Sequence, residues 1–255
     1  GVNVSVGGRP PQIFAIDTGG ELTVVPASLV TALALKPVGT YSFLSLSGKG
    51  FQIPMYALPP LRVGDVTLPQ SFAANWDGLD RLAVPPLLSL WSFANRPVTI
   101  DVAHKTLTFE DAQSFAARTR NAHRVPLAVS RDRDRMLVVF ANLDLGNGQR
   151  GQCEIDTGSK GTMIDARYLP LLGFAQSDKR VVSERSDQAE GPRTDYLATL
   201  PAIALSDAPA MQQSNVAVGF TDHPIYDCLI GNDFWADKVF TFDLAHEQLF
   251  VAPSR

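Results

Sequence analysis

Short runs of alternating apolar and polar positions fill the first hundred residues, and this pattern predicts β-strands joined by tight turns. Residues 2–16 (VNVSVGGRPPQIFAI) predict a hairpin with a Gly-Gly turn. Residues 40–58 (TYSFLSLSGKGFQIPMYAL) predict a second, glycine-tipped hairpin, and residues 61–68 (LRVGDVTL) predict a third. A short helix is expected from residue 27 to residue 35, because Pro37 disfavours helical continuation.

A segment of different character separates this pattern from its repetition later in the chain. Residues 111–135 are polar and Arg-rich, which predicts a connection containing one short strand (VPLAV). We therefore expect three parts: an N-terminal half over residues 1–112, a connection over residues 113–135, and a C-terminal half over residues 136–255.

One short motif, an apolar residue followed by Asp-Thr-Gly, occurs once in each half. A single copy is weak evidence, because Asp, Thr and Gly are ordinary turn residues. However, residues 17–35 match residues 156–174 without a gap, and later blocks match at an offset of 142 residues. The later blocks are Leu58-Pro59 with Leu200-Pro201, Leu87-Leu88-Ser89 with Leu229-Ile230-Gly231, and residues 99–109 with residues 241–251. This colinearity indicates an internal duplication of one β-rich unit.

The two motifs supply two carboxyl groups, Asp17 and Asp156, in matching local settings. A fold with pseudo-two-fold symmetry would bring them face to face. Two carboxylates a few ångströms apart do not both ionise readily, so one keeps a proton while the other stays charged. The charged group takes a proton from water and the protonated group donates to a carbonyl oxygen, which is general acid–base hydrolysis of an amide.

The residues after each Asp suit such a pair. Thr18 and Thr157 carry hydroxyls that can hydrogen-bond across the pseudo-dyad and hold the two loops in register. Gly19 and Gly158 permit a close approach of the backbone.

Composition excludes several other classes of function. The chain has 255 residues, 45% hydrophobic and 19% charged, as in an ordinary globular protein. The net charge of −4 and the pI of about 5.5 argue against a nucleic-acid partner. No apolar run is long enough to span a membrane, no signal peptide is visible, and we expect no metal or cofactor. The first residue is Gly1, which is consistent with removal of an upstream segment.

Two cysteines, Cys153 and Cys228, fit no zinc or redox motif. Two interpretations remain open for them. We favour a pair of buried free thiols over a disulfide between neighbouring strands.

The two halves resemble the two lobes of an aspartic protease of the pepsin/retropepsin class. The second half carries Asp-Thr-Gly-Ser, then residues 229–234 (LIGNDF), and ends in VFTFDLAHEQLFVAP, similar to the final strands of pepsins. The pattern Asp-Thr-Gly-x-x-x-Thr followed by an apolar residue, in which the last Thr is Thr23 or Thr162, is closer to retropepsins. The resemblance implies an all-β fold with two pseudo-symmetric β-barrel lobes, a short helix in each lobe and a cleft between them. It covers nearly the whole chain except the connection.

The resemblance also implies roles for individual residues. Asp17 and Asp156 would be the catalytic dyad, Thr18 and Thr157 would brace the loops, and Gly19 and Gly158 would line the cleft floor. The substrate-binding candidates are Ser47, Gly48, Lys49 and Gly50 in a flap, with Glu21 near the substrate backbone. The flap's counterpart in the second half falls near residues 190–192.

Several positions depart from the family pattern. Ser89 stands where the family has Gly, and its side chain would tilt Asp17. Leu90 and Asn232 stand where retropepsins have Arg, so Glu21 lacks its usual partner. An alternative function is therefore a pseudo-protease that binds extended peptides without cleaving them. A third is an unrelated β-barrel binding protein whose two Asp residues lie far apart.

One asymmetry yields a hypothesis about protonation. Gly20 follows the first motif and Ser159 follows the second. A Ser159 hydroxyl that donates to its own Asp would favour the charged carboxylate. We therefore predict that Asp156 is mainly ionised and that Asp17 mainly holds the shared proton.

The expected substrate is a peptide or protein, cleaved between hydrophobic residues. Because one chain supplies both Asp residues, no dimer is required. The Ala- and Arg-rich composition suggests a bacterial protein of the periplasm or cell envelope.

Overall fold

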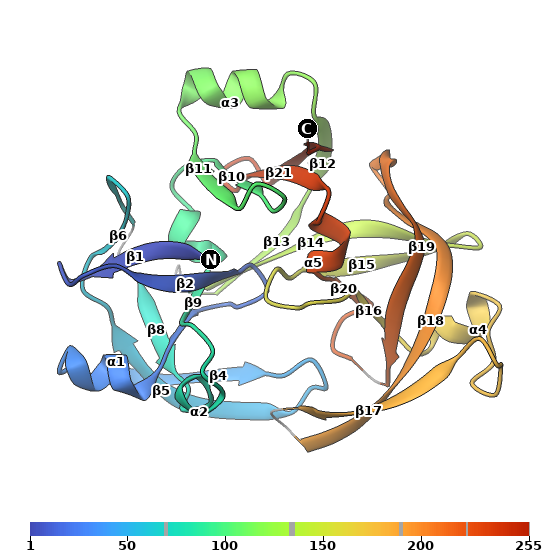
Figure 1. Cartoon of the computed structure of the whole chain (residues 1–255), viewed down its shortest axis with the longest axis horizontal. Coiled ribbons are helices and arrows are strands. Elements are labelled where there is room, and N and C mark those ends of the chain that lie inside the picture. The colour runs from blue at the N-terminus through green and yellow to red at the C-terminus, as the bar shows by residue number, and fades with distance from the viewer. Residues whose placement is uncertain (69–70, 133–135, 189–190, 223, 255) are drawn as a thin grey trace.

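The computed structural model describes residues 1–68, 71–132, 136–188, 191–222 and 224–254. Strands dominate, and they form three sheets (Figure 1). One sheet belongs to the first half, one to the second half, and a third is shared. The expected all-β, two-lobed architecture is confirmed.

The first-half sheet lies on the left in Figure 1. Its strands are β1 (Val2–Val6), β2 (Gln12–Asp17), β3 (Thr23–Val25), β4 (Pro37–Leu44), β5 (Gly50–Ala57), β6 (Leu61–Val63), β7 (Val66–Thr67), β8 (Phe72–Asn75) and β9 (Leu87–Ser89). They are ordered β4-β5-β8-β3-β9-β2-β1-β6-β7. The three predicted hairpins are present as the antiparallel pairs β1–β2, β4–β5 and β6–β7.

The second-half sheet lies on the right in Figure 1. Its strands are β13 (Ala128–Asp132), β14 (Met136–Gly146), β15 (Gln149–Ile155), β16 (Met163–Asp165), β17 (Val182–Gln188), β18 (Gly191–Leu205), β19 (Ala208–Thr221) and β20 (Cys228–Ile230). They are ordered β13-β14-β15-β20-β16-β19-β18-β17. β14 also pairs with β18, so part of this sheet closes on itself.

The third sheet joins the two halves. Its strands are β10 (Val98–Asp101), β11 (Thr106–Phe109), β12 (His123–Pro126), β21 (Lys238–Asp243) and β22 (Gln248–Pro253), ordered β11-β10-β21-β22-β12. Thr99 of β10 lies directly opposite Thr241 of β21, and their hydroxyl oxygens are 2.7 Å apart. These two residues are 142 positions apart, which is the offset of the sequence match.

The turns of this shared sheet also correspond. His104 contacts Asp101 at 2.9 Å in the β10–β11 turn, and His246 contacts Asp243 at 2.7 Å in the β21–β22 turn. Each imidazole therefore stabilises a hairpin turn far from the two Asp-Thr-Gly motifs.

Helices are short. They are α1 (Ala27–Ala32), α2 (Gly78–Leu82), the 3₁₀ helix η1 (Leu90–Phe93), α3 (Ala112–Thr119), α4 (Tyr168–Leu171) and α5 (Asn232–Trp235). The helix predicted after the first motif is present as α1, three residues shorter at its end. No helix in the described part of the chain is long and apolar enough to cross a membrane.

Helix α3 begins the polar connection, where the sequence pattern predicted no helix. Asp111 caps it by accepting a hydrogen bond from the Ser114 backbone N–H at 2.8 Å, while the Ser114 hydroxyl accepts from the Asp111 N–H at 2.9 Å. No residue of α3 is buried. The helix lies at the outside of the shared sheet (Figure 1), and the connection continues through β12 and β13.

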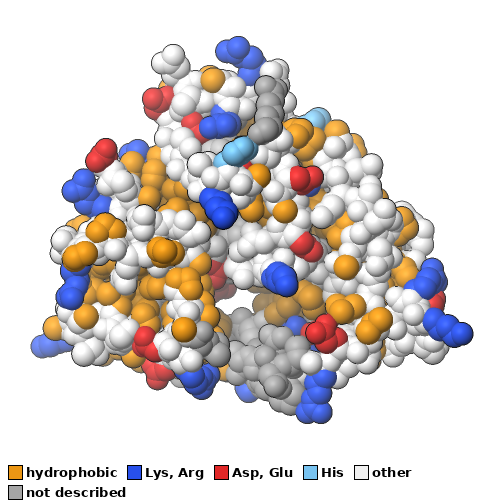
Figure 2. All heavy atoms as spheres, viewed as in Figure 1, with side chains coloured by type: hydrophobic (Ala, Val, Ile, Leu, Met, Phe, Trp, Pro, Cys, Tyr) orange, Lys and Arg blue, Asp and Glu red, His pale blue; other side chains and the backbone are white. Residues whose placement is uncertain are grey.

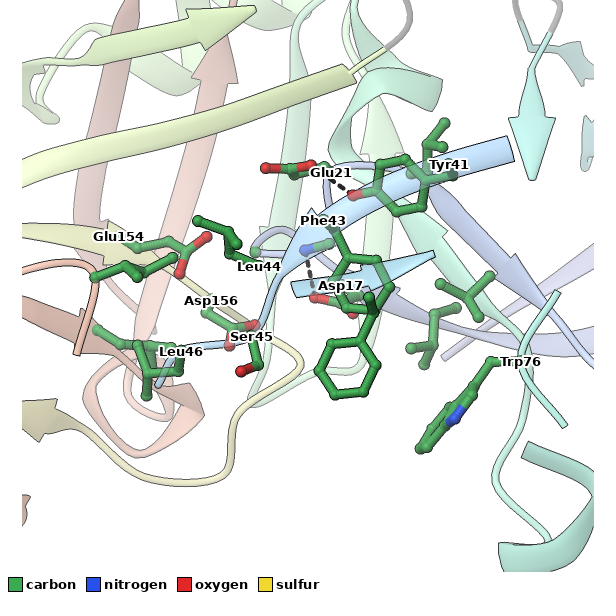
Figure 3. Close-up of a pocket in the computed structure, with 18 of the residues that line it drawn as sticks. Asp17, Glu21, Tyr41, Phe43, Leu44, Ser45, Leu46, Trp76, Glu154 and Asp156 are labelled. Carbon is green, nitrogen blue, oxygen red and sulfur yellow. Dashed lines mark hydrogen bonds between the residues drawn. The ribbon is translucent and has the colours of Figure 1, made fainter. Parts of the chain in front are cut away.

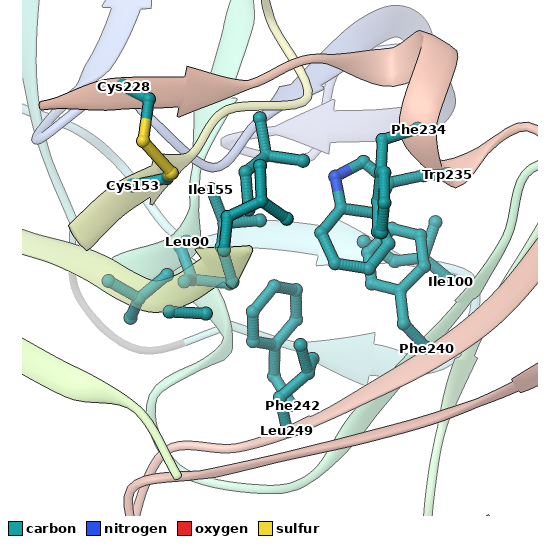
Figure 4. Packing of buried hydrophobic residues seen from close by; sticks show 14 of the residues in the cluster. Leu90, Ile100, Cys153, Ile155, Cys228, Phe234, Trp235, Phe240, Phe242 and Leu249 are labelled. Carbon is teal, nitrogen blue, oxygen red and sulfur yellow. A yellow bond between two sulfur atoms is a disulfide. The ribbon is translucent and has the colours of Figure 1, made fainter. Parts of the chain in front are cut away.

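Aromatic side chains fill the core where α5 meets the shared sheet (Figure 4). Trp235 is fully buried and lies 4.6 Å from Phe240 and 5.0 Å from Phe234, measured between ring centroids. Phe242 packs against Phe240 in turn. This core supports the end of β15, which leads into the second motif.

Cys153 and Cys228 form a disulfide (Figure 4), so the favoured interpretation as free thiols is wrong. The reason is the register of β15 and β20, which run parallel and place the two residues side by side with Cα atoms 4.4 Å apart. The bond lies three residues before Asp156, so it ties the strand that delivers this Asp to its neighbour.

Candidate active site

The two Asp-Thr-Gly loops meet between the halves, and their threonines bind each other's loop. The Thr18 N–H donates to the Thr157 hydroxyl at 3.2 Å, and the Thr157 N–H donates to the Thr18 hydroxyl at 3.0 Å. Each hydroxyl then donates to a backbone carbonyl of the opposite half, Thr18 to Ile155 at 2.6 Å and Thr157 to Ile16 at 2.8 Å. These four reciprocal bonds hold the loops in register, as the sequence predicted.

Gly19 and Gly158 each face the carboxyl group of the opposite half. A Cβ atom on Gly19 would lie 2.6 Å from the Cγ of Asp156, and one on Gly158 would lie 2.6 Å from an Oδ of Asp17. Any side chain at either position would therefore displace a carboxyl group. The requirement for glycine here is steric, because neither residue has a positive φ.

Asp17 and Asp156 are brought together, and their carboxyl groups hydrogen-bond to each other. Burial, followed by the charge of Asp156 and the hydrogen bond to it, raises the pKa of Asp17 to about 7. Burial also raises the pKa of Asp156, but its Oδ1 accepts backbone N–H groups from Gly158 at 2.7 Å and from Ser159 at 3.2 Å, which lower it. The pair therefore favours a proton on Asp17 and a charge on Asp156.

The Ser159 hydroxyl is not the cause of this asymmetry. It donates to the backbone carbonyl of Gly161 at 2.9 Å rather than to Asp156. The predicted role of its side chain is therefore wrong, since Ser159 acts on Asp156 through its backbone N–H. On the other side, Asp17 accepts a backbone N–H from Gly20 at 2.8 Å.

Ser89, which replaces the expected glycine, fits without disturbing Asp17. It is buried, its N–H donates to the Thr23 hydroxyl at 3.3 Å, and its own hydroxyl lies 3.4 Å from the same oxygen. Gly231, its counterpart, has no such room, because a Cβ there would lie 2.4 Å from the backbone of Gly161. The predicted tilt of Asp17 is not supported by these contacts.

Polar side chains brace the second loop. The Asn232 amide donates to the Thr157 carbonyl. Asp233 accepts from Thr162, at 2.9 Å from its hydroxyl and 3.2 Å from its N–H. In the first half the positions equivalent to Asn232 and Asp233 are the apolar Leu90 and Trp91.

A cavity of about 380 Å³ opens above the two Asp residues (Figure 3), where the space-filling view shows a hollow between the halves (Figure 2). Most of its lining is apolar. The apolar lining residues are Leu22, Val24, Phe43, Leu44, Leu46, Phe51, Ile53, Trp76, Leu87, Ile225 and Leu229. The remaining lining is acidic or hydroxyl-bearing, apart from the glycines.

The β4–β5 hairpin covers this cavity as a flap whose tip points toward the second half (Figure 1). The hairpin residues that line the cavity are Tyr41, Phe43, Leu44, Ser45, Leu46, Phe51 and Ile53. The predicted substrate-binding residues Ser47, Gly48, Lys49 and Gly50 form the exposed tip and do not line the cavity.

The flap tip contacts the second half directly. The Ile225 N–H donates to the Leu46 carbonyl at 2.9 Å. The hairpin β17–β18 is the flap's counterpart in sequence order. Residues 189–190, part of the predicted second tip, lie outside the described residues.

Glu21 lies in the cavity, and its partner is a tyrosine rather than an arginine. The Tyr41 hydroxyl donates to Glu21 Oε2 at 2.5 Å (Figure 3). Burial, followed by this bond to Glu21, raises the pKa of Tyr41 above its ordinary value. Tyr41 therefore stays a neutral donor.

Glu154 also lines the cavity, and the sequence analysis missed it. Glu154 lies on β15 two positions before Asp156, which directly follows the strand, and both side chains line the cavity, as the alternation of side chains along an extended chain predicts. That period-two spacing was the available signal. Among the described residues, no group of three His, Cys, Asp or Glu side chains is arranged to hold a metal ion.

With this geometry, the chain has the two-lobed, all-β fold of the acid proteases. The sequence model of the aspartyl protease family matches residues 2–86, which include the first Asp-Thr-Gly motif and the flap. A search of curated proteins gave no match.

Solved structures resemble the chain over almost its full length. One is the crystal structure of basic 7S globulin from soybean, with a sequence identity of 12% and a TM-score of 0.56. The match covers 98% of this chain and 90% of the globulin chain. Another is the crystal structure of the protein edgp, with a sequence identity of 11% and a TM-score of 0.54. That match covers 96% of this chain and 88% of the edgp chain. These likenesses concern the fold.

Proposed function

We propose that this protein is an aspartic endopeptidase. The observation that carries the proposal is the hydrogen-bonded pair of Asp17 and Asp156 at the floor of the cavity, with the pKa of Asp17 raised to about 7. Each half, residues 1–112 and 136–255, supplies one carboxyl group, so a single chain is sufficient. The combination fits a retropepsin-like site duplicated within one chain.

The two carboxyl groups divide the chemistry between them. The ionised Asp156 takes a proton from a water molecule, whose oxygen attacks the carbonyl carbon of the scissile peptide bond. Asp17 donates its proton to the carbonyl oxygen, which gives a neutral tetrahedral gem-diol. Transfer of a proton to the nitrogen then allows the carbon–nitrogen bond to break. No covalent intermediate with the protein is required.

The cavity suits an extended peptide with hydrophobic side chains next to the cleaved bond. Phe43, Phe51 and Leu229 offer apolar surface in the cavity that holds the carboxyl pair. The flap covers the site and excludes water, which strengthens the electrostatic interactions inside. Its contact between Leu46 and Ile225 must open for a substrate to enter.

The test is cleavage of a mixed peptide library from pH 3 to pH 8 by the wild-type protein and by the Asp17→Asn and Asp156→Asn variants. We expect both substitutions to abolish cleavage. The specificity constant should fall above about pH 7, as Asp17 loses the proton it must donate. Asp207→Asn, in the exposed β18–β19 turn, is the matched control and should remain active.

Absence of cleavage at every pH by correctly folded wild-type protein would contradict the proposal. Peptide binding without turnover would then support the pseudo-protease alternative. No contact in the site favours that alternative at present, because Ser89 is accommodated by its hydrogen bond from the backbone to Thr23.

A further inference from the structure

Glu154 is a buried acid that the proposed chemistry does not use. Only 6% of its surface is exposed, and it borders the cavity beside the carboxyl pair. It lies on β15 two positions before Asp156, and both side chains line the cavity. No described residue donates a hydrogen bond to its carboxyl group.

An unpartnered buried carboxyl group is costly, so its place in the cavity calls for a partner. The described residues around Glu154 supply neither a hydrogen-bond donor nor a positive charge for its carboxyl group. Burial, followed by the charges of Asp156, Asp17 and Glu21, raises the pKa of Glu154 well above its ordinary range. None of the described residues that line the cavity is Lys, Arg or His. A cation bound in the cavity would compensate this group of acids and favour the charged form of Glu154.

A second acid borders the same end of the cavity. Glu21 accepts the Tyr41 hydroxyl through Oε2, and no described residue donates to its Oε1. Figure 3 shows Glu21 and Glu154 on one side of the carboxyl pair, with Leu44 of the flap nearby and Trp76 on the other side. The cavity thus has an acidic end and an apolar end.

Only the second half provides this buried acid at the motif. The position equivalent to Glu154 in the first half is Ala15. A feature that served the stability of both loops would be expected in both halves. Glu154 is therefore placed to act on one side of a bound peptide.

We propose that Glu154 and Glu21 bind the cationic side chain of an Arg or Lys residue adjacent to the scissile bond. The inference rests on the proposed function and defines its substrate class. An arginine guanidinium carries five donors in a planar fork, so it can bind both carboxyl groups at once. The apolar end of the cavity remains available for a hydrophobic residue on the other side of the cleaved bond.

The experiment uses matched peptides that differ only at the residues flanking the cleaved bond, carrying Arg, its neutral analogue citrulline, or norleucine. We expect the wild-type protein to favour Arg over citrulline by about 30-fold in kcat/KM, mainly through KM. Glu154→Gln should reduce this ratio to within about threefold of unity, and Glu21→Gln should reduce it partly. Glu247→Gln, in the exposed turn of the shared sheet, is the control and should keep the wild-type ratio.

Ratios within one preparation do not depend on the fraction of active protein, and circular dichroism shows whether each variant folds. Equal cleavage of the Arg and citrulline peptides by wild-type protein would overturn the inference while the proposed function stands. If no peptide is cleaved, the proposed function fails, and binding of the same peptides decides this inference. Tighter binding of the Arg peptide, lost in Glu154→Gln, would support it, and equal binding would overturn it.

Discussion

The two Asp-Thr-Gly loops have the same backbone roles but different surroundings. Both present one carboxyl group, one bridging threonine and one glycine that the opposite carboxyl group requires. Backbone N–H groups of Gly20 and Gly19 lower the pKa of Asp17, whereas those of Gly158, Ser159 and Gly19 lower the pKa of Asp156. This difference favours the charge on Asp156 and the proton on Asp17.

The packing behind the loops differs as well. The second loop is braced by the Asn232 amide, the Asp233 carboxylate and a nearby disulfide, whereas the first is braced by apolar packing around Leu90. Symmetry thus brings the two carboxyl groups together, while local departures from symmetry give them different preferences for the proton. The following predictions test that view, from the largest expected effect to the smallest.

Loss of the disulfide is expected to have the largest effect on stability. The disulfide is also a difference between the halves, because both of its cysteines lie in the second half. Its first-half counterparts at the two sequence offsets are Phe14 and Pro86. Replacing Cys153 and Cys228 together with Ala should lower the free energy of unfolding by about 2–5 kcal/mol. Thermal unfolding with and without a reductant measures this. A reductant should destabilise only the wild-type protein, and a variant as stable as the oxidised wild type would contradict the prediction.

Gly158→Ala should disrupt the carboxyl pair, because its Cβ would lie 2.6 Å from Asp17. We expect kcat to fall by about 100-fold, since a displacement of about 1 Å has effects of that order. Gly161→Ala is the control, because its Cβ would come no closer than 3.8 Å to Asp233. Steady-state kinetics on one peptide compares them, and equal activities would show that the close approach is unimportant.

Exchanging Ser89 and Gly231 tests whether each loop needs its own residue. Gly231→Ser places a side chain 2.4 Å from the Gly161 backbone, so it should destabilise the protein by about 2–3 kcal/mol. Ser89→Gly keeps the bond from the backbone N–H to Thr23, removes only the weak hydroxyl contact at 3.4 Å, and should cost about 1 kcal/mol. Denaturant unfolding of both variants gives the two values. A larger loss in Ser89→Gly would reverse the comparison.

The protonation of Asp17 should make stability depend on pH. Folded Asp17 keeps its proton up to about pH 7, whereas an unfolded Asp loses it near 3.8, so the free energy of unfolding falls as pH rises between these values. Asp17→Asn removes this dependence and should be more stable than wild type at pH 8 by about 2 kcal/mol. Melting temperatures at pH 4 and pH 8 test this. Parallel pH curves for the two proteins would contradict it.

Ser159→Ala should have the smallest effect. The hydroxyl bonds to the Gly161 carbonyl, and the alanine variant keeps the N–H that Asp156 accepts. We therefore expect the acid limb of the pH–rate profile to stay within about 0.3 pH units of wild type. A clear rise of that limb would mean that the hydroxyl reaches Asp156 in the working enzyme.

The sequence predicted those features that depend on local signals or on repetition. Turn glycines and alternating strands located the hairpins, including the flap at residues 40–58. The repeated motif identified Asp17 and Asp156 as a candidate pair before any geometry was known. Helix α3 was missed because its segment has one large apolar residue, Phe115, and buries none of its residues, although the Asp111–Ser114 cap is visible in the sequence.

Features that depend on distant pairing could not be predicted in the same way. The disulfide follows from the register of β15 against β20, and no local pattern defines that register. The sequence predicted the position of the flap tip at residues 47–50, but not which flap residues face the cavity. Leu44 and Leu46 line the cavity, whereas residues 47–50 do not. Glu154 could have been predicted as a site residue, because it lies two positions before Asp156 in a strand-like segment, where such residues share a face.

The division of the carboxyl pair between two distant segments also has a consequence during synthesis. Asp17 emerges from the ribosome 139 residues before Asp156, which corresponds to roughly 10–30 s of translation. Strands β21 and β22, which complete the sheet shared by both halves, emerge later still. A nascent chain therefore carries only half of the pair until most of it has been made, so the proposed peptidase activity would arise only when folding is nearly complete.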